Sequence, residues 1–226
     1  MPDKYAVMGH PIGHSKSPQI HQQFAEQCGL DIEYTAIDVA PGTFADAVKD
    51  FQQQGGKGLN VTVPYKLEAW QLVDRRSKRA ELAGAVNTIK FNHNKTLFGE
   101  NTDGIGLVRD ITQNLNTPLK DKSILLLGAG GAVRGILGPI LEQQPKLLHI
   151  ANRTVSKAEE LKTVFAELGS ITASGFDDIK QTFDIVINGT AASLQGELPP
   201  LPDTLFNDNA LAYDLMYAKE PTAFMT

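Results

Sequence analysis

The chain has 226 residues, a net charge of −5 and a pI near 5.5, with 42% hydrophobic and 21% charged residues. These values argue against nucleic acid as a partner, and no apolar run is long enough to span a membrane. The single cysteine, Cys28, excludes an internal disulfide and fits a reducing compartment, and the N-terminus lacks a signal-peptide pattern, so we expect a cytoplasmic protein.

The first half of the chain alternates strand and helix signals. Ser17 followed by Pro18 predicts a helix with Ser17 as N-cap, which Gly29 ends. Its apolar face would be Ile20, Phe24 and Cys28, with Cys28 in the core. The other elements expected here are strands at 5–8, 33–37 and 59–63, helices beginning near 44 and 64, and a hairpin of 86–91 with 96–99.

The second half has a regular pattern after a helix expected at 104–116. Strands are predicted at 123–127, 147–151, 184–187 and 210–214. A helix follows the first of these with Pro139 inside it, and another is predicted at 156–168 with a Ser156–Glu159 capping box. Strands that alternate with helices indicate an α/β fold with a parallel sheet covered on both faces.

A Gly-rich turn, Gly128-Ala129-Gly130-Gly131, follows an apolar strand and opens a helix. This is the context that a dinucleotide fingerprint requires, because glycine lets backbone N–H groups approach a pyrophosphate at a helix N-terminus. The last fingerprint position is Val133 instead of glycine, so we expect the helix and strand to lie slightly further apart. Cofactor binding is favoured over a simple tight turn.

The end of the next strand indicates which dinucleotide binds. An NAD site usually has an acidic residue there, whereas this chain has Asn152-Arg153-Thr154, with Lys157 one turn later. Arginine can pair with a 2′-phosphate at two points, so the sequence favours NADP over NAD.

Two polar motifs precede the Gly-rich turn and carry Lys66 and Asp103, an ammonium and a carboxylate that can share a proton beside a reacting alcohol or ketone. Asn60 and Thr62 project to the same face of one strand. Ser15 and Ser17 stand near a helix N-terminus, where two hydroxyls suit a carboxylate ligand. The proton-transfer role requires that Lys66 and Asp103 face each other near the cofactor. No set of residues predicts a metal site.

The chain resembles the shikimate dehydrogenase family in motifs that follow the family's order along nearly the whole sequence. These motifs are Ser15–Pro18, Asn60–Lys66, Gly84–Thr88, Asn101–Gly104, Gly128–Arg134, Asn152–Thr154 and Tyr213–Tyr217.

The resemblance implies reversible reduction of 3-dehydroshikimate to shikimate with NADPH, in aromatic amino-acid and chorismate biosynthesis. It implies an N-terminal α/β substrate domain over 1–103 and a Rossmann-like, doubly wound NADP-binding domain over 104–226, with the active site in the cleft between them.

The resemblance also assigns site residues. Lys66 and Asp103 would be catalytic. The residues implied to bind substrate are Ser15 and Ser17, for its carboxylate, and Asn60, Thr62, Asn87 and Tyr217, for its other oxygens. Those implied to bind the cofactor are Gly128, Ala129, Gly130, Gly131, Ala132, Asn152, Arg153, Thr154, Lys157, Thr190 and Leu215.

Family members continue beyond the position of Thr226 into helices that pack on the substrate domain, so we expect apolar surface exposed on that domain here. Two alternatives stay open: a quinate/shikimate dehydrogenase of relaxed specificity, and a truncated, non-catalytic NADP-binding protein. The sequence leaves the oligomeric state open, and a homodimer is among the states it allows.

Overall fold

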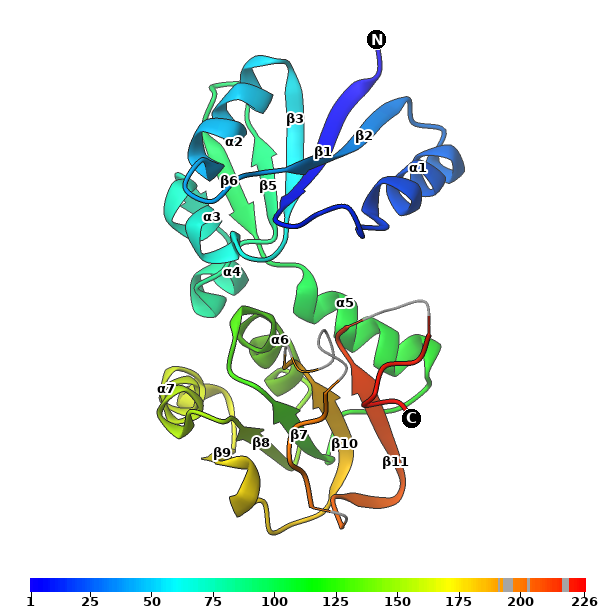
Figure 1. The fold of residues 1–226 in the computed structure, drawn as a ribbon, viewed down its shortest axis with the longest axis vertical. Helices are drawn as coiled ribbons and strands as arrows, with labels where there is room; N and C mark the ends of the chain where they lie inside the picture. The colour runs from blue at the N-terminus through cyan, green and yellow to red at the C-terminus, as the bar shows by residue number, and fades with distance from the viewer. Residues whose placement is uncertain (191, 193–196, 203, 217–219) are drawn as a thin grey trace. The chain divides into compact units, whose positions relative to one another are not determined.

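The computed structural model describes residues 1–190, 192, 197–202, 204–216 and 220–226. The chain divides into two compact units, Met1–Thr102 and Asp103–Thr226, and each is described by itself (Figure 1). Within the parts of the chain so described, no helix is long and apolar enough to cross a membrane.

Unit 1 is built on a six-stranded mixed sheet in the order β2-β1-β3-β5-β6-β4. The strands β1, β2 and β3 are parallel, and β5 and β6 form the antiparallel hairpin that the sequence predicts. Its elements are β1 (Asp3–Gly9), α1 (Ser17–Cys28), β2 (Ile32–Asp38), α2 (Phe44–Gln53), β3 (Gly56–Val61), α3 (Lys66–Leu72), β4 (Arg75–Arg76), α4 (Lys78–Ala83), β5 (Thr88–Phe91) and β6 (Leu97–Glu100).

The core of unit 1 lies on the face of the sheet that α2 and α3 cover. Side chains alternate along a strand, so Ala6 and Met8 of β1 point into this core. Three apolar residues of α2, Phe44, Val48 and Phe51, pack against them and are at most 8% exposed. This period of three to four residues is what a helix needs to bury one face, so the prediction for α2 is confirmed.

The predictions for α1 were wrong in two respects. Lys16 is the N-cap and makes no side-chain capping bond, so Ser17 is the first helical residue. Ala25 is the buried residue of the helix, while Phe24 is 55% exposed and Cys28 is also exposed. A spacing of four residues identifies one face of a helix, but it does not show that the protein covers that face.

Unit 2 holds a five-stranded, wholly parallel sheet in the order β11-β10-β7-β8-β9, which confirms the predicted parallel sheet. Its strands are β7 (Ser123–Leu127), β8 (Leu147–Ala151), β9 (Ile171–Ser174), β10 (Phe183–Asn188) and β11 (Phe206–Asp214). Its helices are α5 (Asp103–Arg109), α6 (Gly131–Leu141) and α7 (Val155–Phe165). Pro139 lies inside α6, which continues two residues beyond it.

Two helix predictions in unit 2 need correction. The helix expected over 104–116 is α5 followed by a π-helical turn, Asp110–Asn114. The capping box on α7 is absent, because the helix begins at Val155 with Thr154 as N-cap, and Glu159 instead accepts from Lys162 Nζ at 3.0 Å. Because α7 begins at Val155, Glu159 lies in the second turn of the helix, where its side chain cannot reach the N-cap Thr154.

His149 lies within β8, is 7% exposed, and has both ring nitrogens hydrogen-bonded. Nδ1 lies 2.7 Å from the Thr172 hydroxyl, and Nε2 lies 2.9 Å from the Ser174 hydroxyl. Ser174 donates its own proton to the Gly175 carbonyl, so Ser174 accepts from Nε2 and Nδ1 accepts from Thr172. Burial lowers the pKa of His149 and favours this neutral ring.

We therefore expect His149 to make unit 2 less stable in mild acid. As the pH falls below about 6.5, the unfolded chain takes up a proton that the buried ring resists, so the free energy of unfolding decreases by at most about 1.4 kcal/mol per pH unit for this group. Denaturant titrations between pH 7.5 and 5.5 should show a smaller loss of stability in His149→Gln than in wild type. His93→Gln, at an exposed turn, should follow wild type. Parallel curves for wild type and His149→Gln would refute this.

Candidate active site

The segment that carries Thr62 and Lys66 is fixed by the buried ring of Tyr65. This residue is 1% exposed, stacks on Phe44 with ring centroids 4.9 Å apart, and donates its hydroxyl to the Val39 carbonyl at 2.6 Å. The carbonyl of Lys66 accepts from the Val86 N–H at 2.9 Å. Lys66 thus begins α3 on a well-anchored backbone with its side chain half-buried.

Ser15 and Ser17 lie at the start of α1 and interact with each other. The Ser15 hydroxyl accepts from the backbone N–H of Ser17 at 3.2 Å, so Ser15 provides part of the helix-end capping that the sequence assigned to Ser17. Both side chains are half-buried.

Asn60 and Asn87 belong to one hydrogen-bonded cluster in unit 1. Asn60 donates through Nδ2 to the Thr88 hydroxyl at 3.0 Å and to the Asn87 carbonyl at 3.4 Å. Asn87 accepts through Oδ1 from the Thr102 N–H at 3.0 Å, and its Nδ2 donates to the Thr102 hydroxyl at 3.0 Å. The sequence analysis assigned no role to Thr88 and Thr102, although both lie within quoted motifs.

The residues before Asp103 are fixed by Glu100 and Asn101. Asn101 is 2% exposed and donates to the Ala85 carbonyl at 3.1 Å. The Glu100 carboxylate accepts from the Asn101 N–H at 2.8 Å and pairs with Arg79 at 3.0 Å. Asp103 is the first residue of α5 and of unit 2, whereas Lys66 belongs to unit 1.

The Gly-rich turn has the features that a pyrophosphate needs. Gly128 has φ +102°, and a Cβ there would lie 3.1 Å from the Gly189 carbonyl oxygen, so the turn requires glycine. A Cβ at Gly130 or Gly131 would meet none of the described atoms within 4 Å, so these positions open on free space. Since α6 begins here, its first N–H groups lack partners within the helix and can bind a phosphate. Ala129 and Ala132 flank this opening and are half-buried.

Val133, the departure from the fingerprint, is buried against Gly189 at the end of β10. A Cβ at Gly189 would lie 2.5 Å from Val133 Cγ2, which is a clash. The glycine absent from the helix is therefore compensated by a glycine directly after strand β10.

We expect Gly189→Ala to destabilise unit 2 by about 1–3 kcal/mol, the usual cost of overpacking a core. The double variant Val133→Ala/Gly189→Ala should recover most of that loss, because it removes the clashing methyl. Thermal unfolding of both variants with Val133→Ala alone as the control checks this, and equal stability of the single and double Gly189 variants would contradict it.

The loop after β8 carries the residues predicted to select NADP. Asn152 donates through Nδ2 to the Thr154 carbonyl at 2.8 Å, which closes the turn. Arg153 and Thr154 are exposed on this loop, and Lys157 is exposed in the first turn of α7. The nearby carboxylate of Glu160 pairs with Arg134 at 2.8 Å, so its charge is partly neutralised.

Thr190 and Leu215 are both held by Asn188, which is fully buried at the end of β10. The Asn188 side-chain oxygen accepts from the Thr190 hydroxyl at 2.8 Å, and its carbonyl accepts from the Leu215 N–H at 2.9 Å. Its amide donates to Asp214 at 3.3 Å, and Asp214 also accepts from the Thr222 hydroxyl at 2.6 Å.

Asn188 and Asp214 thus organise this end of the sheet, a role that the sequence analysis missed. Tyr217, a predicted substrate residue, lies outside the described residues. Among the described residues, no group of three or more His, Cys, Asp or Glu side chains could hold a metal ion.

Comparisons with known proteins match both units. The model of the shikimate dehydrogenase substrate binding domain matches residues 7–89, and the model of shikimate/quinate 5-dehydrogenase matches residues 109–195. The chain belongs to the shikimate dehydrogenase family.

Relatives and solved structures match nearly the whole chain. A shikimate dehydrogenase (NADP(+)) of Hydrogenovibrio crunogenus is 54% identical over 228 residues, which cover 100% of this chain and 82% of that protein. An Ael1 enzyme from Pseudomonas putida superposes with a TM-score of 0.90 at 48% identity, covering 99% of this chain and 82% of that one. Shikimate 5-dehydrogenase from Thermus thermophilus, solved with NADP(H) and shikimate, superposes with a TM-score of 0.86 at 31% identity, covering 99% of this chain and 82% of that one.

Proposed function

We propose that the protein is an NADP-dependent shikimate dehydrogenase, an oxidoreductase that reversibly reduces 3-dehydroshikimate to shikimate in aromatic amino-acid biosynthesis. The observation that carries this is the 54% identity, over the entire chain, to a protein named shikimate dehydrogenase (NADP(+)). Gly130 and Gly131 at the start of α6, where an added Cβ would meet none of the described atoms within 4 Å, support the dinucleotide part of the proposal.

The substrate is held by polar residues of unit 1 in this proposal. Ser15 and Ser17 bind its carboxylate. The residues that hold its remaining oxygens are Asn60, Thr62, Asn87 and Tyr217. The half-buried serines at the α1 terminus and the cluster around Asn60 and Asn87 support these roles, since both groups are ordered by bonds within the protein.

The proton is handled by Lys66 and Asp103. Reduction turns the carbonyl oxygen of the substrate into a hydroxyl, so that oxygen must gain a proton, and the reverse reaction must remove it. NADPH supplies the hydride when it is bound. The protein contributes the proton path, the orientation of the substrate and the exclusion of water.

The cofactor is held by unit 2. The Gly128–Ala132 segment binds the pyrophosphate, and Asn152, Arg153, Thr154 and Lys157 surround the adenosine phosphate. Thr190 and Leu215, both anchored by Asn188, contact the nicotinamide half. We further propose a cytoplasmic location, and a homodimer remains the assembly to test, by light scattering.

The test follows NADPH formation by absorbance with NADP and either shikimate or quinate. We expect turnover with shikimate and at most slight turnover with quinate, because the relatives are named for shikimate. Comparable rates on both substrates would favour an enzyme of relaxed specificity. Absence of any shikimate-dependent reduction would refute the proposal.

A further inference from the structure

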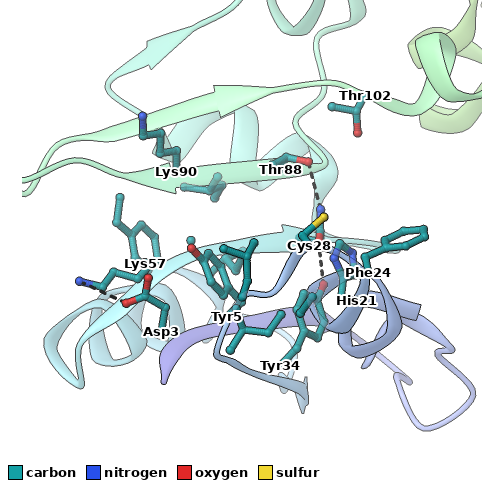
Figure 2. A pocket seen from close by; sticks show the side chains of 18 of the residues that line it. Asp3, Tyr5, His21, Phe24, Cys28, Tyr34, Lys57, Thr88, Lys90 and Thr102 are labelled. Atoms are coloured by element: carbon teal, nitrogen blue, oxygen red, sulfur yellow. Dashed lines mark hydrogen bonds and ion pairs between the residues drawn. The ribbon is translucent and has the colours of Figure 1, made fainter. Parts of the chain in front are cut away.

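A chain of hydrogen bonds crosses the α1 face of the unit 1 sheet and includes residues that the proposed function does not use. It borders a pocket of about 820 Å³ formed by α1 and the strands β1, β2, β3 and β5 (Figure 2). The pocket is largely apolar, and exposed Phe24 is part of its lining. Tyr34 and Asn60 are among its polar lining residues and are hydrogen-bonded to each other.

Tyr34 crosses the sheet to make this contact. It belongs to β2, which is separated from β3 by β1, yet its hydroxyl donates to Asn60 Oδ1 at 2.6 Å. The aromatic ring of Tyr34 stacks on His21 of α1, with ring centroids 4.3 Å apart and an interplanar angle of 3° (Figure 2). Burial raises the pKa of the Tyr34 phenol and lowers that of His21, so Tyr34 stays a proton donor and His21 stays neutral near pH 7.

The bonds around Asn60 define which way its amide points. A side-chain amide has two N–H donors and an oxygen with two lone pairs. The two donors are directed to the Thr88 hydroxyl and the Asn87 carbonyl, and one lone pair accepts from Tyr34. A second lone pair remains for another donor.

Rotation of the amide by 180° would break this arrangement at Thr88. The Thr88 hydroxyl already donates its proton to Asn87 Oδ1 at 3.0 Å, so it has none to give to the oxygen of a rotated Asn60. The Tyr34 hydroxyl would also lose its acceptor. The same Asn87 oxygen accepts from the Thr102 N–H, so one series of bonds orients both asparagines.

We infer that Tyr34 is a positioning residue for substrate binding: its hydroxyl holds Asn60 so that Oδ1 accepts a hydrogen bond from a ring hydroxyl of the substrate, while Thr88 extends the same order to Asn87. The inference rests on the proposed function, in which both asparagines bind the oxygens of shikimate. Because Asn60 is already oriented, less side-chain entropy is lost when the substrate binds.

The variant Tyr34→Phe removes the hydroxyl and keeps the ring that stacks on His21. We expect it to raise the KM and the Kd for shikimate about fivefold to tenfold, the usual effect of one buried hydrogen bond, with kcat within about twofold and NADPH affinity unchanged. Thr88→Val, which releases Asn60 from the other side, should raise the same two constants. Tyr5→Phe is the matched control, because Tyr5 lines the same pocket on the neighbouring strand, and it should behave as wild type.

Shikimate analogues that each lack one ring hydroxyl separate positioning from a general loosening of the unit. The penalty of Tyr34→Phe on Kd should vanish for the analogue that lacks the hydroxyl bound by Asn60 and persist for the others. An equal penalty for all analogues, or no penalty with shikimate in an active enzyme, would overturn the inference alone. A wild-type protein without shikimate-dependent turnover would instead overturn the proposed function, and the inference with it.

Discussion

Lys66→Ala should lower the turnover number for shikimate oxidation by about a hundredfold or more, with a smaller change in KM. A positioned group that transfers a proton in the transition state contributes about 10²–10⁴-fold to the rate, and alanine cannot replace it. If Lys66 acted only in substrate binding, KM would rise and kcat would stay constant. Steady-state rates at saturating NADP, measured over a range of shikimate concentrations, distinguish these cases.

Lys57→Ala provides the matched control for Lys66→Ala. Lys57 is in the same unit, its side chain is 53% exposed, and its pairing with Asp3 at 3.8 Å is a surface interaction that stabilises little. Its loss should leave kcat and KM within about twofold of wild type. A comparable fall in both lysine variants would mean that general loss of positive charge, and not a specific proton transfer, explains the result for Lys66.

Asp103→Asn should reduce kcat to a similar degree, because asparagine preserves shape while removing the proton acceptor. If Lys66 and Asp103 serve the same proton, the double variant Lys66→Ala/Asp103→Asn should be only slightly slower than the slower single variant. Effects that multiply would indicate that the two groups act independently. Near wild-type rates in either single variant would remove the role assigned to that residue.

The sequence predicted the elements whose patterns are set by local physics. Continuous apolar runs at 123–127 and 147–151 became β7 and β8 because both faces of a parallel sheet are buried. The Gly-rich turn was recognisable because Gly128 requires positive φ. The family resemblance added the site residues, and their roles stay predictions.

The errors arose where tertiary contacts decide the outcome. The spacing of Phe24 and Cys28 correctly indicated a helix, yet nothing local revealed that this face borders an open pocket. Likewise, the compensation between Val133 and Gly189 joins residues 56 positions apart, so the sequence showed only that the fingerprint was incomplete. The hub residue Asn188 was missed because burial, and not residue type, makes it important.

Arg153→Ala should weaken NADPH binding by about 10–100-fold and change NADH binding less than twofold. Hydrogen bonds to charged groups contribute about 1.5–3 kcal/mol, and each 1.4 kcal/mol corresponds to tenfold in Kd. NADH lacks the 2′-phosphate, so it loses no such contact when the guanidinium is removed. Quenching of protein fluorescence, from Trp70 and the tyrosines, or calorimetry gives both dissociation constants.

The weakening must be selective for NADPH over NADH, because an exposed arginine could also act through the overall charge of unit 2. Arg109→Ala removes the same charge from the exposed last turn of α5 and should leave both dissociation constants unchanged. If Arg153→Ala weakened the binding of NADPH and NADH equally, Arg153 would contact a group that both cofactors share. Preference for the phosphate would then have to come from Thr154, the N-cap of α7, and Lys157 in its first turn.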